Sequence, residues 1–165
     1  MLNENNDNMG FSTTSGTFAT TGAATTHATT TTINYIIEGI GYIKTAITGG
    51  TTPTTDIITG LPITLTAGNA RSVLWLLDAS GNVAVTASPI VTWDGGTTAP
   101  NYGFASNVPA ITGVPDGYAP FALQLLKGGS TLSGTWTFGS SNWNATGLTV
   151  VVKNVLTLPP RPILN

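Results

Sequence analysis

The sequence of 165 residues contains no Cys and very little charge. The absence of Cys excludes disulfides, thiol catalysis, and zinc or iron–sulfur sites built on Cys ligands. Charged residues make up 7% of the chain, against about a quarter in ordinary globular proteins. The five Lys and Arg residues are scattered and the pI is near 4.9, so no basic patch can neutralise phosphates. We therefore expect no nucleic-acid partner.

Long apolar runs are also missing. No stretch approaches the roughly 20 apolar residues that cross a bilayer, so no membrane association is expected. The first residues, "MLNENNDN", are acidic and rich in amides, whereas a signal peptide begins with basic residues followed by an apolar segment. The sequence therefore predicts synthesis in the cytoplasm without a cleaved export signal.

Thr, Ser, Asn and 20 Gly residues take the place of the missing charge. Thr is β-branched and favours strands over helices. With a net charge of −2 and a mean hydropathy of +0.22, the chain can bury a core. Soluble monomers usually carry more surface charge than this, which favours a protein whose surface is covered by partners, including copies of itself.

Residues 1–31 are predicted to form an extended Thr-rich N-terminal arm. Phe11 and Phe18 are its only large apolar anchors. Such a segment cannot bury enough surface by itself to offset the entropy lost on ordering. We therefore expect a neighbouring subunit to hold the arm, with the two Phe side chains among the contacts.

The segment "INYIIEGIGYIKTAITGG", residues 33–50, is the least polar part of the chain. A helix would place Gly39 and Gly41 in its interior at a cost of about 1 kcal/mol each, so a hairpin joined at residues 38–41 is favoured. The period of a strand places Ile33, Tyr35 and Ile37 on one face and Ile36 on the other. Ile36 is then predicted to meet a second layer or a neighbouring subunit.

The remaining sequence shows turn signals every 8 to 15 residues and no convincing helix. The clearest hairpin is "RSVLWLLDASGNVAVTAS", with its turn at residues 78–82. We predict an all-β fold for residues 32–158, a β-sandwich or jelly-roll-like barrel of roughly eight strands. Residues 159–165, "PRPILN" preceded by Pro159, form an extended C-terminal tail in which Pro160 and Arg161 are candidate partner contacts.

Catalytic and metal-binding signatures are weak throughout. His27 is the only His and lies in the predicted arm, which is a poor support for a triad, so it is interpreted as an ordinary polar residue. The carboxylates of the domain mostly lie beside Gly or in turns, where Asp accepts local hydrogen bonds. The stretch "NENNDNMG" lacks the Gly position and closing Glu of a calcium loop. No catalytic, cofactor-binding or metal site is predicted, and no cofactor is expected.

The four Trp residues divide into two groups. Trp75 in "VLWLL" and Trp136 in "TWTF" are predicted to lie in the core. Trp93 and Trp143 lie near loops and could be exposed, either for contact with a partner protein or for stacking on sugars.

The combination of features resembles the small virion proteins of tailed bacteriophages. The residues that carry the resemblance are "INYIIEGIGYIKTA", the "LLDASGNVAV" hairpin and "VPDGYAPFALQLL", and the resemblance covers about residues 33–126. It implies a non-enzymatic cement or decoration protein, most often trimeric, that binds the outside of the assembled head and bridges subunits of the major capsid protein. The arm and the C-terminal tail depart from this layout.

The candidate partner contacts are Phe11, Phe18, Ile36, Trp93, Trp143, Pro160 and Arg161. The alternative interpretation is another virion component, such as a head fibre, a tail protein or a receptor-binding tip. A glycan hydrolase and a surface-layer or pilus subunit are further alternatives.

Overall fold

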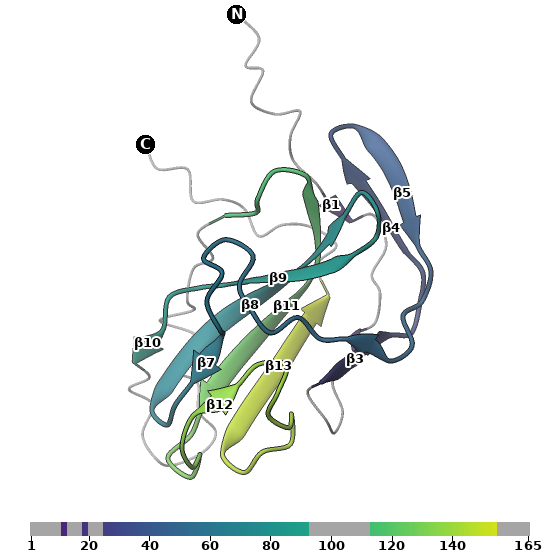
Figure 1. Ribbon diagram of the computed structural model, residues 1–165. Coiled ribbons are helices and arrows are strands. Elements are labelled where there is room, and N and C mark those ends of the chain that lie inside the picture. The colour runs from purple at the N-terminus through teal and green to yellow at the C-terminus, as the bar shows by residue number, and fades with distance from the viewer. Residues whose placement is uncertain (1–10, 13–17, 20–24, 93–112, 155–165) are drawn as a thin grey trace, which may run out of the picture.

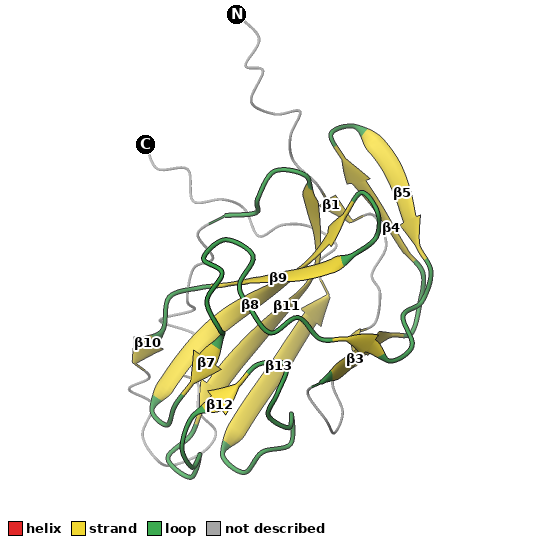
Figure 2. Ribbon diagram, viewed as in Figure 1, coloured by secondary structure: helices red, strands yellow, loops and turns green. Residues whose placement is uncertain are grey.

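The computed structural model describes residues 11–12, 18–19, 25–92 and 113–154. These residues contain strands and turns and no helix (Figure 2). The strands are β1 (Phe11–Ser12), β2 (Phe18–Ala19), β3 (Thr26–Thr29), β4 (Ile33–Ile37), β5 (Ile40–Lys44), β6 (Gly50–Thr51), β7 (Thr64–Leu65), β8 (Asn69–Asp78), β9 (Val83–Ala87), β10 (Val91–Thr92), β11 (Tyr118–Gly128), β12 (Trp136–Thr137) and β13 (Leu148–Asn154). Every strand pair is antiparallel. The predicted all-β class is confirmed.

The largest sheet has five strands, in the order β10-β8-β11-β13, with β9 also paired to β8. The two long strands β8 and β11 form its centre (Figure 1). The predicted turn between β8 and β9 is confirmed, because Oδ1 of Asp78 accepts the backbone N–H groups of Ser80 and Asn82 at 2.8 Å each. These bonds replace backbone pairing where the chain reverses.

The predicted hairpin over residues 33–44 is also confirmed. The chain reverses at Glu38 and Gly39, whose φ angles are 52° and 77°. Two successive positive φ values are the signature of the two-residue turns that match the twist of a hairpin. The turn is thus shorter than the predicted joint at residues 38–41, and Ile40 already belongs to β5. On β4, Ile33 and its two alternate neighbours are buried, as the strand period predicts.

Two short sheets complete the fold, in the orders β12-β7 and β2-β3-β6, and β1 extends the hairpin sheet to β1-β4-β5. The described parts of residues 1–31 are therefore strands paired with the same chain. Phe11 lies opposite Ile36, and Phe18 lies opposite Thr29. Backbone pairing within the chain supplies some of the order that was expected from a neighbouring subunit.

The hydrophobic core lies between one face of the five-stranded sheet, the inner face of the hairpin and the β7–β12 pair. Trp75 is its centre and is fully buried. Its ring lies 5.5 Å from that of Phe138 and 6.3 Å from that of Phe121. The predicted core positions of Trp75 and Trp136 are confirmed, since Trp136 is only 2% exposed.

Candidate interaction surface

Three large apolar side chains are exposed together on the turn that leads into β7. They are Ile57, Ile58 and Leu61, with exposed fractions of 45%, 51% and 64%. The turn begins at Asp56, whose N–H donates to the carbonyl of Leu61 at 2.9 Å. We call residues 56–61 the apolar turn.

Buried Asp56 fixes the shape of the apolar turn. Its Oδ1 accepts the N–H of Ile58 at 2.8 Å and that of Thr59 at 3.4 Å. Its Oδ2 accepts the N–H of Ala87 on β9 at 3.2 Å. The N–H of Ile57 also donates to the carbonyl of Val85 at 2.9 Å. Hydrogen bonds to an ionised carboxylate are stronger than neutral ones, so the turn is anchored to the central sheet.

This geometry confirms the interpretation of Asp56 as a turn residue that accepts local hydrogen bonds. The sequence analysis missed the exposure of the apolar residues beside it. The available signal was "DIITGL", in which Asp and Gly mark a turn that contains large apolar residues. Such residues are normally buried, so their exposure on a fixed turn indicates a contact surface.

The hairpin of β4 and β5 carries a second set of exposed apolar side chains. Ile43 is 72% exposed and Ile40 is 58% exposed, while Ile36 is half-buried. Ile36 lies opposite Gly41 on β5 and opposite Phe11 on β1, so it occupies the centre of the small sheet. The predicted apolar second face is therefore present, and Ile43 is its most exposed residue.

The inner face of the hairpin is tied to the turn between β8 and β9. The hydroxyl of Tyr35 donates to the carbonyl of Asp78 at 2.8 Å. Burial raises the pKa of Tyr35, and the nearby charge of Asp78 raises it further. Tyr35 also stacks on Tyr42 at a centroid distance of 5.5 Å. The hairpin is thus held at a fixed position relative to the central sheet.

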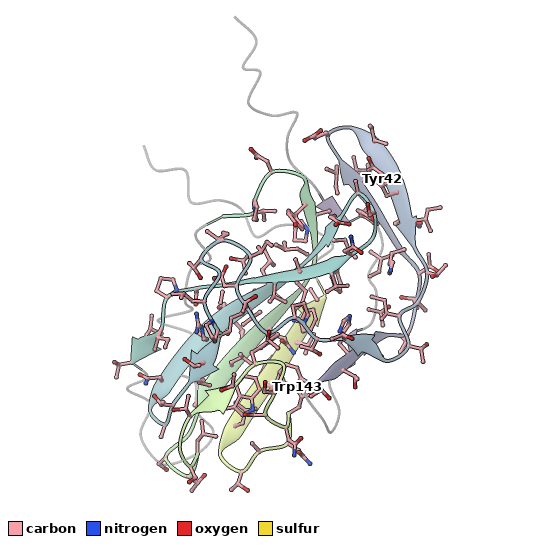
Figure 3. The ribbon with its side chains drawn as sticks, in the orientation of Figure 1. Tyr42 and Trp143 are labelled. Atoms are coloured by element: carbon pink, nitrogen blue, oxygen red, sulfur yellow. The ribbon has the colours of Figure 1, made fainter. Side chains whose placement is uncertain are left out.

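Trp143 is not exposed, contrary to the sequence interpretation. It is 5% exposed and packs against Trp136 at 5.4 Å and Phe138 at 5.2 Å (Figure 3). Its loop folds back over the core and turns the ring inward. Trp143 therefore cannot serve as an exposed sugar platform or a direct partner contact in this conformation.

The other predicted contact residues are only partly covered by the structure. For Phe11 and Phe18 the backbone pairing is described, but the side chains lie outside the description. Trp93, Pro160 and Arg161 lie outside the described residues. Of the seven candidates, Ile36 is the one for which the structure supports a position at the edge of the core.

His27 is buried rather than an ordinary polar residue of an arm. It is 3% exposed and its ring lies 5.0 Å from that of Trp75. Burial lowers the pKa of His27 to about 4, and the positive charge of Lys44 contributes in the same direction. The polar residues around His27 concealed this position, because the strand period of β3 buries alternate residues regardless of the composition between them.

Within the described ranges, no group of three or more His, Asp or Glu side chains is placed to hold a metal ion. The same residues include no helix long and apolar enough to cross a membrane. Comparisons of the chain with known protein families, with curated proteins and with solved structures each gave no match.

Proposed function

We propose that this protein is a structural component of a bacteriophage virion, a cement or decoration protein that attaches to the outside of the assembled head and bridges subunits of the major capsid protein. The observation that carries the proposal is the apolar turn, whose three exposed apolar side chains are fixed by a buried carboxylate. A surface of this kind stabilises a complex when it is covered and has no evident use on an isolated molecule.

The energetics favour attachment through many weak contacts. Covering the exposed parts of Ile57, Ile58 and Leu61 contributes roughly 1 kcal/mol for each side chain, since each is already about half covered. One such contact is weak. Several contacts made by one oligomer on one shell act together, because the later ones are intramolecular. This supports a homo-oligomer, with the trimer implied by the resemblance as its proposed form.

The low charge of the chain supports the same proposal. Charged side chains lose favourable hydration when an interface forms, and that loss often cancels their attraction. Hydroxyl and apolar side chains are desolvated at lower cost. With 7% charged residues, most of the surface can be covered by capsid protein without that penalty. The proposed location is the exterior of the head, after synthesis in the host cytoplasm.

The test uses heads of the parent phage prepared without this protein. The triple variant Ile57→Ser, Ile58→Ser, Leu61→Ser is added to these heads and binding is measured by co-sedimentation. Ile90→Ser is the matched control, because Ile90 is 46% exposed but lies outside the apolar turn. We expect the wild type and the control to bind and to raise the temperature at which the heads rupture.

The triple variant is expected to bind at least about tenfold more weakly, from a loss of a few kcal/mol spread over three side chains. Wild-type protein that does not bind the heads, or that binds without changing their rupture temperature, would contradict the proposal. Localisation of the protein in the particle by electron microscopy separates a cement protein from a head fibre or a tail component.

A further inference from the structure

The outer edge of β5 is the starting point of a second inference, which does not depend on the proposed function. β5 is the last strand of the sheet β1-β4-β5, and its other edge has no strand partner among the described residues. Figure 1 shows β5 at the margin of the molecule. An unpaired edge offers backbone donors and acceptors to another strand.

The turn geometry determines which backbone groups point outward. Ile37 and Ile40 flank the two-residue turn and therefore form a hydrogen-bonded pair. Such pairs alternate along an antiparallel ladder, so Tyr42 and Lys44 also direct their backbone groups toward β4. Gly41 and Ile43 consequently direct their N–H and C=O groups away from β4.

We infer that the edge of β5 pairs with β5 of a second copy of this chain, antiparallel and with the two-fold axis at Tyr42. In this register Gly41 of each copy lies opposite Ile43 of the other. Both residues have outward backbone groups, so each of these two pairs exchanges two bonds and the contact contains about four hydrogen bonds. Tyr42 then faces Tyr42 of the second copy as a pair without hydrogen bonds.

The side chains fit the same register. A Cβ placed on Gly41 would have no atom within 4 Å, so the backbone there is uncovered. Ile43 is 72% exposed and in this register covers Gly41 of the second copy. Ile40, at 58% exposure, lies opposite the aliphatic stem of Lys44. Cross-strand neighbours of this kind are the unit of stabilisation in a sheet.

The strand also lacks the usual protection against such pairing. Protected edges carry Pro, a bulge or a charged side chain in the middle of the strand. "IGYIK" has its only charge at the last position and pairs with β4 in regular register. Two five-residue strands cover less than the roughly 1,200 Å² of a typical stable interface, so we expect a dimer that forms at about 0.1 mM.

Disulfide trapping tests the register directly, because the natural chain has no Cys. Tyr42→Cys places two thiols in a pair without hydrogen bonds, where the Cα atoms are about 4.5 Å apart and a disulfide fits. Under mild oxidation at about 0.1 mM we expect a covalent dimer. Ile58→Cys, 51% exposed on the apolar turn, is the control and is expected to remain largely monomeric.

Gly41→Cys and Ile43→Cys report the two neighbouring registers. Cross-linking that is strongest in either variant would overturn the register with its axis at Tyr42. If none of the three β5 variants cross-links faster than the control, the inference is wrong.

Proline substitution gives an independent test without oxidation. Ile43→Pro removes an outward N–H and leaves the bonds to β4 intact, since Pro is tolerated at edge positions that face solvent. Ile43→Thr keeps the N–H and the β-branched shape. Sedimentation equilibrium is expected to show a dimer for the wild type and for Ile43→Thr, and a monomer for Ile43→Pro.

Circular dichroism and a thermal melt establish that each variant is folded. Dimerisation of folded Ile43→Pro equal to that of the wild type would overturn the inference. So would a wild type that forms trimers without the β5 contact or stays monomeric at about 1 mM. These measurements are made without heads, and Ile43→Pro can be added to heads separately, so failure of edge pairing is distinguishable from failure of capsid attachment.

Discussion

Lowering the pH is expected to destabilise the protein through His27. The imidazole is 3% exposed and lies beside Trp75 and the backbone of Gly50, where a Cβ would be only 2.9 Å from its ring. The folded state therefore favours the neutral ring, and the pKa of His27 falls from 6.5 to about 4. The unfolded chain takes up a proton near pH 6.5.

The sign of the effect follows from this difference. Above pH 6.5 the ring is neutral in both states and the contribution of His27 to stability is complete. Between pH 6.5 and about 4 the unfolded state binds more protons, so the free energy of unfolding decreases as the pH falls. One pKa unit corresponds to about 1.4 kcal/mol, so the loss approaches about 3 kcal/mol near pH 4.

The assay compares urea unfolding of the wild type and of His27→Gln at several pH values from 7.5 to 4. Gln does not titrate, so its curve records the contribution of the carboxylates alone, including Asp78, whose pKa is lowered despite its partial burial by hydrogen bonds from Asn82, Ser80 and Gly81. We expect the wild type to lose up to about 3 kcal/mol more than the variant over this range. Because His27 is the only His, its pKa can also be measured from a single NMR signal. Equal pH dependence of both proteins, or a measured pKa at or above 6.5, would refute the argument.

Three further changes test the packing, each by urea titration. Gln124→Leu is expected to lower the free energy of unfolding by about 1–3 kcal/mol, because the amide oxygen of Gln124 accepts the Nε1 proton of buried Trp75 at 2.8 Å. Asp56→Ala is expected to cost about 2–4 kcal/mol, since three backbone N–H groups lose their acceptor; a near-neutral result would show that the apolar turn does not depend on this carboxylate. Gly147→Ala is expected to cost more than about 2 kcal/mol, because φ is 83° and the new Cβ would meet neighbouring backbone, whereas Gly41→Ala, with no atom within 4 Å, should cost less than about 1 kcal/mol. Equal stability of these two Gly variants would contradict the described packing.

The fold could be predicted where the local signals agree with one another. In the hairpin at residues 33–44, the Gly residue at the turn and the alternation of Ile33, Tyr35 and Ile37 specify the same structure, and the structure confirms it. The turn at Asp78 was predictable for the same reason, because a short carboxylate satisfies backbone groups where the chain reverses.

The surroundings of His27 and Trp143 could not be predicted in this way. Each residue is buried by partners that come from distant parts of the chain: Trp75 for His27, and Trp136 with Phe138 for Trp143. Local composition, rich in Thr for one and in Ser and Asn for the other, indicated exposure. Burial at these sites is decided by tertiary packing, which overrides local preference.

The aromatic cluster around Trp75 has a consequence for the kinetics of folding. Its rings come from strands that are far apart in the sequence, including Phe121 on β11 and Phe138 beyond β12. The entropy of closing these loops must be lost before the rings can touch, and all-β domains with such contacts fold in about milliseconds to seconds. During that interval the apolar residues of β8 stay uncovered. Newly synthesised chains are therefore most prone to aggregation before this cluster closes, and the order in which the strands dock determines how long that period lasts.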